Sequence, residues 1–324
     1  MNQGGNSIWY RCFFSFITFF FRITRSKPHS FNEKIKYKAA FDRREILTVF
    51  ADKIAVREYV SRTVGDKYLP QCYLTTRQPS EIDWNAIPNE FVMKANHCSG
   101  GVVVVWRGAD EGSVLPANRK DIYWARYLVK PENLVKSDLV NLAKSWLDKN
   151  YSYSFLSRRV PEWAYLNIER QILFEELLIE GGNSIARDYK FHMFNGRCEM
   201  INVIERNKFG FMGNKKNYSS VFDSRWNKLS VSLNGNFSPS IIPEEPNNFM
   251  EMLNVATELA QGIDYVRVDL YNVDGRIVFG ELTSYPQSGR NTYHLENDLD
   301  REGFGSQDYD LLLGSKLILD KYDQ

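Results

Sequence analysis

Apolar residues early in the chain recur at the spacing of an α-helix, and this pattern predicts helices over residues 30–68. Ser30 opens this region with Glu33 three positions later, a pairing that predicts a capping box. Within it, residues 49–64 are predicted as a helix that Gly65 ends. A further predicted helix covers residues 136–150, where leucine, alanine and tryptophan side chains share one face.

Runs of β-branched and aromatic residues predict strands over residues 68–75, 90–95 and 101–106. Residues 188–195 and 197–205 flank the turn Asn195-Gly196, which predicts a β-hairpin. Residues 266–272 and 276–282 form a second predicted hairpin, and a predicted helix at 247–262 separates the two. Mixed helices and antiparallel strands predict an α+β fold rather than a doubly wound parallel sheet.

The N-terminal segment is strongly apolar and aromatic over residues 8–23, too short for the ~20 residues of a membrane-spanning helix. No small-residue cleavage site follows it, which argues against a cleaved signal peptide. Its polar residues fall on one narrow stripe of a predicted amphipathic helix (residues 1–30), namely Arg11, Ser15, Thr18, Arg22 and Arg25. This helix either packs on the protein itself or lies in a membrane surface. Deleting residues 1–26 and measuring membrane association decides between the two.

The charge balance bears on the class of function. Lys and Arg number 41 against 40 Asp and Glu, so the net charge is +1, without the cationic excess of a nucleic-acid-binding surface. The cysteines form no CxxC pair and have no zinc-ligand spacing, which favours a reduced, cytoplasmic compartment; they are Cys12, Cys72, Cys98 and Cys198.

The C-terminal hairpin carries the strongest candidate for chemistry. Arg267 and Asp269 are two residues apart on one strand, so they share a face, and Glu281 and Thr283 do so on the other. Two carboxylates beside an arginine offer oxygen ligands to Mg²⁺ and a clamp for phosphate. The alternative is a surface ion pair on a hairpin.

The turn of this hairpin decides whether its two strands can share the metal. A two-residue Asp274-Gly275 turn would put the two pairs of side chains on opposite faces. A three-residue loop over residues 273–275, with Gly275 left-handed and a bulge, would put them on one face. We predict the bulged loop.

Other segments offer weaker signals. Lys94 at a strand end is followed by the small-residue turn Ser99, Gly100 and Gly101, which lacks Walker A spacing. This segment is either a phosphate site, with the ammonium and the N–H groups of the turn as donors, or a plain hairpin. Residues 172–178 form an apolar run with two glutamates, either an adenine-binding slot or a strand end with solvated acids. Asp188, Lys190 and His192 share one face of a strand, toward either solvent or a site. The basic, glycine-bearing stretch 206–216 is either an anion-binding loop or a solvated one.

In their order along the chain, these segments resemble the ATP-grasp superfamily, and more closely the TupA-like ATP-grasp proteins of teichuronopeptide and surface-polysaccharide biosynthesis. The resemblance runs through most of the chain after residue 30, in the stretches FNEKIKYK (31–38), ADKIAVREYV (51–60), FVMKANHCSGGVVVV (91–105), ILFEELL (172–178), DYKFHMFNG (188–196) and VRVDLY…GELTSYPQSG (266–289).

The resemblance implies ATP held between two α+β lobes. Its phosphates would meet Lys53 and Lys94, under a lid that contains the turn Ser99, Gly100 and Gly101. Adenine would lie against a hinge formed by Glu175, Glu176, Leu177 and Leu178, and the ribose near Asp188. Magnesium would be held by Asp269 and Glu281, with Thr283 where many ATP-grasp enzymes have an asparagine. The candidate catalytic residues are Arg267, Lys190 and Arg206.

The implied domains are an amphipathic helix (1–30), a helical region (31–88), a lid subdomain (89–180) and a C-terminal subdomain with the metal site (181–324). The implied activity is an ATP- and Mg²⁺-dependent carboxylate–amine ligation through an acylphosphate. It would join an amino acid or amine to a uronic acid of a surface polysaccharide, in the cytoplasm at the inner membrane face. The alternatives are a sugar or glycan kinase on the same fold and a non-catalytic subunit of capsule assembly.

Overall fold

The computed structural model of the chain describes residues 27–115, 126–149, 162–182, 184–205, 217–236, 239–295 and 306–319. The predicted N-terminal amphipathic helix lies almost entirely outside these ranges, as do Arg206 and the stretch 206–216. Among the described residues, no helix is both long and apolar enough to cross a membrane.

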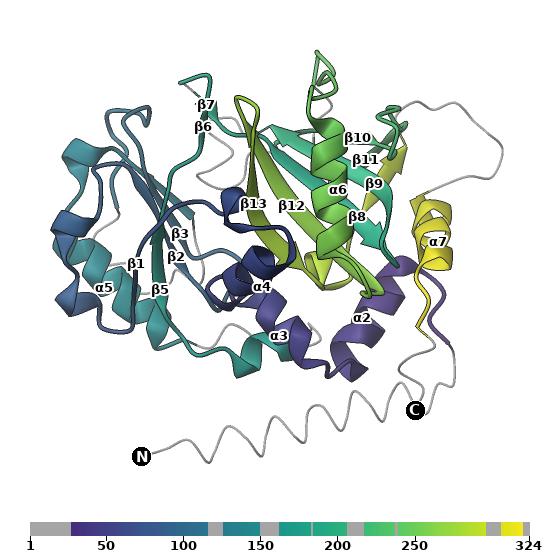
Figure 1. Ribbon diagram of the computed structural model, residues 1–324, viewed down its shortest axis with the longest axis horizontal. Helices are drawn as coiled ribbons and strands as arrows, with labels where there is room; N and C mark the ends of the chain where they lie inside the picture. Colours follow the sequence, from purple (N-terminus) through teal and green to yellow (C-terminus); the bar gives the residue numbers. More distant parts are fainter. Residues whose placement is uncertain are drawn as a thin grey trace.

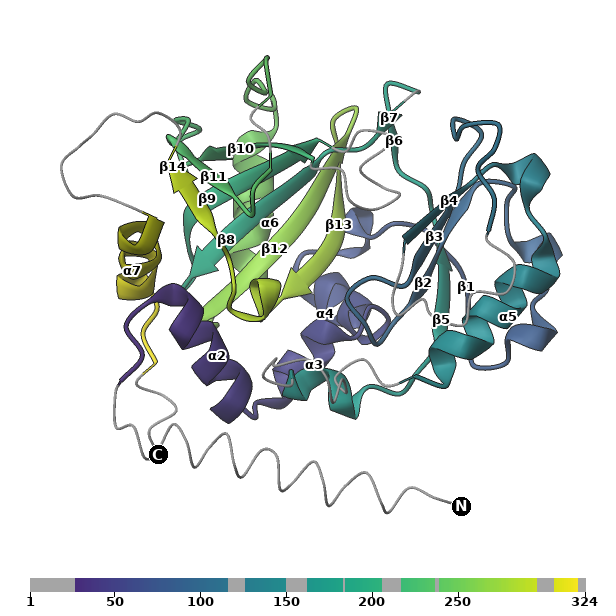
Figure 2. The ribbon, with the colours of Figure 1, turned by 180° about the vertical axis from the view of Figure 1, so that it is seen from behind.

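The first of two large sheets is formed by strands between residues 72 and 175. Its order is β1-β5-β2-β3-β4, with bounds Cys72–Thr76, Ile172–Glu175, Phe91–Ala95, Val102–Val105 and Arg126–Val129. All neighbours are antiparallel except β3 and β4, which are parallel. Helix α5 (Lys136–Leu147) packs its buried Leu139, Ala143 and Trp146 against one face of this sheet (Figure 2). The other face is left for the site described below.

The second sheet combines the two predicted hairpins. Its order is β10-β9-β8-β12-β13, with bounds Tyr218–Phe222, Arg197–Glu205, Asp188–Phe194, Tyr265–Val273 and Arg276–Thr283. Strands β8 and β12 pair antiparallel and so join hairpins that lie far apart in the sequence. Helix α6 (Phe249–Leu259) covers one face with a large apolar core (Figure 1). Together the two sheets and their helices confirm the predicted α+β fold.

Three N-terminal helices lie below and between the two sheets (Figure 1). They are α2 (Phe31–Phe41), α3 (Glu45–Ala51) and α4 (Ala55–Thr63). The predicted capping box is confirmed, because Ser30 accepts a hydrogen bond from the Glu33 amide and Glu33 reaches back to the amide of Ser30. The predicted continuous helix 49–64 is wrong. The side chain of Asp52 accepts from the Ile54 amide (2.8 Å) and breaks the helix there, which leaves Lys53 between two helices.

The remaining described elements are short. Helix α7 (Ser306–Lys316) packs against α2. Two small antiparallel pairs are β6 with β7 and β11 with β14 (Ile179–Glu180, Ser184–Ile185, Val231–Leu233 and Tyr293–Leu295). Short 3₁₀ turns complete the structure, η1 to η6 (Asp66–Tyr68, Pro79–Glu81, Trp84–Ala86, Pro131–Asn133, Trp163–Asn167 and Pro286–Ser288).

A buried ion network ties the N-terminal helices to the start of β12. Lys38 is fully buried and contacts Asp42 (2.6 Å) and Asp264 (2.9 Å). Arg44 contacts the same two carboxylates, each at 2.6 Å. Burial alone would raise the pKa of Asp42, but the hydrogen bonds and charges of Arg44 and Lys38 lower it to about 2. The network anchors β12 three residues before its first charged side chain in the site, Arg267.

The turn between β12 and β13 differs from our prediction. Val273 pairs with Arg276, so the turn is a plain two-residue one with left-handed Asp274 and Gly275 (φ 49° and 91°). The bulged three-residue loop is therefore wrong. A bulge does occur, but farther from the turn. Leu270 pairs with Phe279, whereas the residue before it, Asp269, pairs with Glu281. Gly280 is the extra residue, and it brings the two carboxylates opposite each other.

Gly280 fits only because it has no side chain. A Cβ there would lie 2.9 Å from Cε2 of Tyr271 and 3.0 Å from the carbonyl oxygen of Asp269. We expect Gly280→Ala to lower the free energy of unfolding by about 1–3 kcal/mol, the usual cost of overpacking. Urea denaturation measures this. Gly112→Ala is the control, because nothing lies within 4 Å of a Cβ at that position. Equal stability of the two variants would contradict this account of the bulge.

Candidate active site

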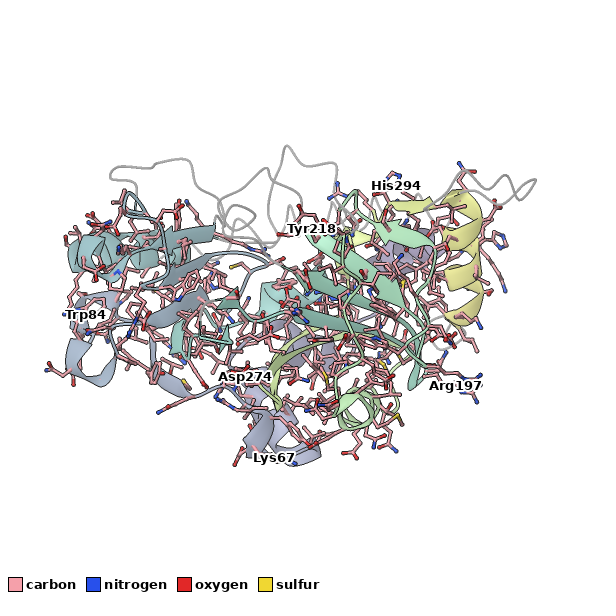
Figure 3. The ribbon with its side chains drawn as sticks, turned by 90° about the horizontal axis from the view of Figure 1, so that it is seen from above. Lys67, Trp84, Arg197, Tyr218, Asp274 and His294 are labelled. Carbon is pink, nitrogen blue, oxygen red and sulfur yellow. The ribbon has the colours of Figure 1, made fainter. Side chains whose placement is uncertain are left out.

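A cavity of about 670 Å³ opens between the two sheets and is lined by residues of both. Asp274, at the tip of the β12–β13 hairpin, lies at the junction of the two halves of the molecule, whereas Trp84 and Arg197 lie at opposite ends (Figure 3). Most of the predicted site residues line this cavity, namely Lys53, Lys94, Ser99, Gly100, Glu175, Glu176, Leu177, Leu178, Asp188, Lys190, Arg267, Asp269, Glu281 and Thr283. Gly101 is buried beside it, and its carbonyl accepts from the amide of Ala95 (3.1 Å). Arg206 lies outside the described residues.

A row of polar side chains crosses the cavity face of the second sheet. Strand register places Asn202, Lys190, Asp269 and Glu281 next to one another on β9, β8, β12 and β13. Lys190 forms an ion pair with Asp269 and lies 3.8 Å from Asp188. The predicted common face of Asp188 and Lys190 therefore faces the cavity rather than solvent.

Arg267 is the centre of this charged face. Its guanidinium donates to Asp269 Oδ1 (2.6 Å), to Glu281 Oε1 (2.6 Å) and to Thr283 Oγ1 (3.0 Å). Thr283 in turn donates to the same Glu281 oxygen (2.9 Å). One cation thus holds both carboxylates and the threonine in fixed positions.

The two carboxylates differ in exposure. The side chain of Asp269 is 3% exposed, whereas that of Glu281 is 43% exposed and opens to the cavity. Burial alone would raise the pKa of Glu281, but the charges of Arg267, Lys190 and Lys53 hold it well below its ordinary value. Glu281 is therefore ionised at neutral pH and presents a fixed negative charge to a ligand.

His192 lies beside Arg267 in the register and lines the cavity. Burial, with the charges of Arg267 and Lys190, lowers its pKa well below the ordinary value. Its Nδ1 is 2.9 Å from the hydroxyl oxygen of Tyr265. The ring is thus neutral at physiological pH and adds no charge beside Arg267.

The donor set fits magnesium better than zinc. Within the described ranges, no three His, Cys, Asp or Glu side chains gather as a metal cluster. Two carboxylates and a hydroxyl are hard oxygen donors, and Mg²⁺ ordinarily takes one or two carboxylates together with phosphate oxygens and water. Asp269, Glu281 and Thr283 match that pattern.

Cations also line the opposite side of the cavity, on the first sheet and beside it. Lys94 on β2 forms an ion pair with Glu175 of β5, whose other oxygen lies 3.8 Å from Arg57. The ammonium of Lys53 donates to the carbonyl of Cys98 in the β2–β3 turn. Apolar side chains line the same side and form a slot, comprising Val92, Val102, Val104, Leu177 and Ile185.

The hinge segment connects the two sheets at the hairpin tip. Glu176 forms a two-fold ion pair with Arg276 (2.6 and 2.7 Å), and its amide donates to the carbonyl of Gln71 (2.9 Å). The Gly181 amide donates to Asp274 Oδ1 (3.2 Å). The apolar slot therefore lies at the hairpin-tip end of the cavity, and the charged cluster lies farther along β12 and β13.

Comparison with known proteins agrees with this arrangement. The family described as TupA-like ATPgrasp matches residues 33–317. The chain belongs to this family. This family match confirms the resemblance inferred from the sequence and identifies the fold as an ATP-grasp fold. No curated protein matches the chain.

Several solved structures are similar to this TupA-like ATP-grasp chain at low identity. D-alanine–D-alanine ligase from Bacillus anthracis is 14% identical, with a TM-score of 0.40 over 84% of this chain and 69% of that one. ATP-grasp ligase PsnB with its minimal precursor is 12% identical, with a TM-score of 0.37 over 84% and 60%. L-amino acid ligase from Bacillus licheniformis is 14% identical, with a TM-score of 0.42 over 90% and 57%. The chain thus spans less than two thirds of PsnB and of the amino acid ligase, and the family assignment rests on the family match alone.

The cavity of this ATP-grasp chain also contains residues that the sequence did not single out. Asn202 is one, since its position on β9 becomes informative only when β9 is known to pair with β8. The others come from distant segments, and they include Arg126, Glu162 and Tyr165. No local pattern marks them, because their place in the site depends on long-range packing.

The turn that contacts Lys53 contains a buried histidine, His97. The ring of His97 is 2% exposed, and its Nε2 lies 3.1 Å from the carbonyl oxygen of Trp146. Burial, then the charge of Arg170, lowers its pKa from 6.5 to about 4. The unfolded chain therefore binds a proton below pH 6.5 that the folded protein does not bind until about pH 4.

We expect the free energy of unfolding to fall as pH drops from 6.5 toward 4, by up to about 1.4 kcal/mol per pH unit for this histidine. His97→Gln removes that contribution but keeps a donor for the carbonyls of Trp146 and Lys149. Urea denaturation at several pH values should give a flatter pH dependence for the variant. An unchanged slope would show that His97 already titrates normally in the folded state.

Proposed function

We propose that this protein is an ATP- and Mg²⁺-dependent carboxylate–amine ligase that forms an amide through an acylphosphate. The observation that carries the proposal is the cluster of Arg267, Asp269 and Glu281, which faces Lys53 and Lys94 from across one cavity. Cations around a magnesium-type donor set are what transfer of a phosphoryl group requires. Family membership supports the same activity.

The predicted residues that line the cavity suggest how ATP would lie in it. Adenine fits the apolar slot by Leu177 at the hinge, with the ribose near Asp188. The triphosphate then runs along the sheet, between the cationic side chains of Lys53 and Lys94 and those of Lys190 and Arg267. Asp269 and Glu281, with Thr283, would hold Mg²⁺, which offsets negative charge on the phosphates. Arg267 is already fixed by its bonds to both carboxylates, so it needs little reorganisation.

The chemistry proceeds in two displacements. A substrate carboxylate oxygen attacks the γ-phosphorus, the bond to the bridging oxygen breaks, and ADP leaves with the electron pair. An uncharged amine then attacks the acyl carbon, the C–N bond forms, and the C–O bond to phosphate breaks. One amine proton leaves with the departing hydrogen phosphate. The side chains position the substrates and neutralise the charge of the phosphates. No covalent intermediate on the protein is needed.

The finer proposal concerns the substrates. The resemblance to proteins of surface-polysaccharide biosynthesis supports a uronic acid as the carboxylate and an amino acid or amine as its partner. The predicted amphipathic helix at residues 1–30 supports work at the inner face of the plasma membrane, where a lipid-linked glycan would be reached.

Trapping with hydroxylamine tests the reaction type. The protein is incubated with ATP, Mg²⁺, glucuronic acid or another uronic acid, and hydroxylamine, and both hydroxamate and ADP are measured. We expect the two products in equal amounts, each dependent on the carboxylate. A stable phosphate ester without hydroxamate would instead identify a sugar kinase. Failure to bind Mg-ATP in calorimetry would point to a non-catalytic subunit.

Glu281→Gln keeps the shape of the side chain and removes its charge. We expect ADP formation to fall by at least about 100-fold, the scale of losing one electrostatic contact in a phosphoryl-transfer site. Glu199→Gln is the matched control, since Glu199 lies on β9 and pairs with Lys316 (3.4 Å), away from the residues that line the cavity. A Glu281→Gln protein with wild-type rates would remove the metal assignment.

A further inference from the structure

Asn202 lies on the cavity face of β9, next to Lys190 in the row of polar side chains. The residue is 4% exposed, and its Oδ1 is buried without a hydrogen-bond partner among the described residues. A buried acceptor that makes no hydrogen bond destabilises the folded state. Such an atom beside a binding cavity is expected to gain a donor when a ligand is bound.

Of the four side chains around Asn202 on this face of the sheet, one is a donor. Side chains alternate along a strand, so Met200 and Ile204 flank Asn202 on β9. Directly opposite lie Val221 on β10 and Lys190 on β8. The first three carry no donor, whereas the ammonium of Lys190 has three protons to donate. Opposite side chains of an antiparallel pair are close enough to interact, so Lys190 can reach the amide of Asn202.

In this structure Lys190 is held by a different partner. Its ammonium forms an ion pair with Asp269 and lies 3.8 Å from Asp188. Arg267 donates to both oxygens of the same Asp269 carboxylate, to Oδ1 at 2.6 Å and to Oδ2 at 2.7 Å. In the proposed function Asp269 is a metal ligand, and a metal ion there would lie next to two cations. Because like charges so close together repel, one of the two cations is expected to move.

Lys190 is the cation that can move more readily. Among the described residues, Arg267 makes four hydrogen bonds, to Asp269, Glu281 and Thr283, which fix its guanidinium. The ammonium of Lys190 makes one, at the end of a flexible four-carbon stem. A move of this ammonium to the neighbouring strand would release Asp269 and also give the buried amide its missing donor.

We propose that Asn202 is a positioning residue for Lys190, which leaves Asp269 when the site takes up Mg²⁺ and the nucleotide and then donates to Asn202 Oδ1. This assignment rests on the proposed function. The amide is neutral, so it holds the ammonium without cancelling its charge, and the other ammonium protons are free to meet the phosphates. The exchange of partners turns a cation that balances Asp269 into one that binds phosphate.

Asn202→Leu keeps the approximate size of the side chain and removes the acceptor. Because Oδ1 has no described partner, the melting temperature without metal and nucleotide should stay unchanged or rise slightly. The Kd for Mg-ADP, measured by calorimetry, should rise by at least about 10-fold, the loss expected for a hydrogen bond to a charged group. An unchanged Kd overturns the assignment, whatever the melting temperature.

Ser220→Ala is the matched control. Ser220 is fully buried on β10, and its Oγ likewise has no described partner. It lies opposite Val203, on the face of the sheet that α6 covers, and it does not line the cavity. We expect a similarly small effect on the melting temperature and a Kd for Mg-ADP within about 2-fold of wild type. A rise in Kd as large as that of Asn202→Leu would show a general effect of the sheet and would contradict the specific role of Asn202.

A double-mutant cycle with Lys190→Met separates positioning of the lysine from a direct contact with the nucleotide. In the Lys190→Met protein, Asn202→Leu should change the Kd for Mg-ADP by less than about 2-fold, because the partner of the amide is already gone. If Asn202→Leu costs the same affinity with and without Lys190, Asn202 acts on the nucleotide itself and the assignment is wrong.

A crystal structure of the wild-type protein with Mg-ADP gives a second measurement that needs no variant. We expect Lys190 Nζ within hydrogen-bond distance of Asn202 Oδ1 and no longer paired with Asp269. A lysine that still pairs with Asp269, beside a metal ion bound there, overturns the exchange of partners. Failure of the wild type to bind Mg-ADP in calorimetry is a different outcome, because it removes the proposed function on which the assignment rests.

Discussion

One extra residue in β13 decides which way the charged side chains of the hairpin face. A strand alternates its side chains, so the plain turn at Asp274 and Gly275 would send Asp269 and Glu281 to opposite faces. Gly280 shifts the register by one position and turns both carboxylates toward the cavity. Its close approach to Tyr271 and to the backbone of Asp269 leaves little room for a Cβ. The site therefore depends on a local irregularity in an otherwise regular sheet.

Once both carboxylates face the cavity, their charge has to be balanced. Arg267 and Lys190 do this from neighbouring strand positions, where strand pairing sets the distances. Burying such a cluster is costly unless every charge has a partner, and here each carboxylate has one. A magnesium ion is positively charged and a polyphosphate is negatively charged. The ion can therefore pair with the two carboxylates, and the phosphates can pair with Arg267 and Lys190. The buried network around Lys38 and Asp264 holds the start of β12 against the helices and keeps the cluster in place.

Much of the local structure could be predicted because it follows from nearby residues. The Ser30–Glu33 cap, the Asn195-Gly196 hairpin and the common face of Arg267 and Asp269 all depend on spacing within a few positions. The ATP-grasp family was reached from the order of motifs, and the family match confirms it. The roles of the individual site residues stay predictions, although the cavity brings nearly all of those within the described residues together.

What the sequence did not reveal depends on distant contacts. The bulge sits at Gly280 and not at the turn, at a position where a Cβ would lie close to the ring of Tyr271 and to the backbone of Asp269. The pairing of β8 with β12 and the parallel pair β3 and β4 involve partners far along the chain. The cavity also brings together Glu162 and Tyr285, which lie more than a hundred residues apart and carry no shared motif.

The extra residue Gly280 places Asp269 opposite Glu281, where in the proposed function they hold a metal ion beside the phosphates of the nucleotide. A crystal structure of the protein with ADP and Mn²⁺ in place of Mg²⁺ tests this most directly, because manganese is located by its anomalous scattering. We expect the manganese peak within bonding distance of both carboxylates, with ADP phosphates beside Lys94 and Lys190 and adenine at Leu177. A metal bound elsewhere, or ADP bound with no metal at Asp269 and Glu281, would contradict the account.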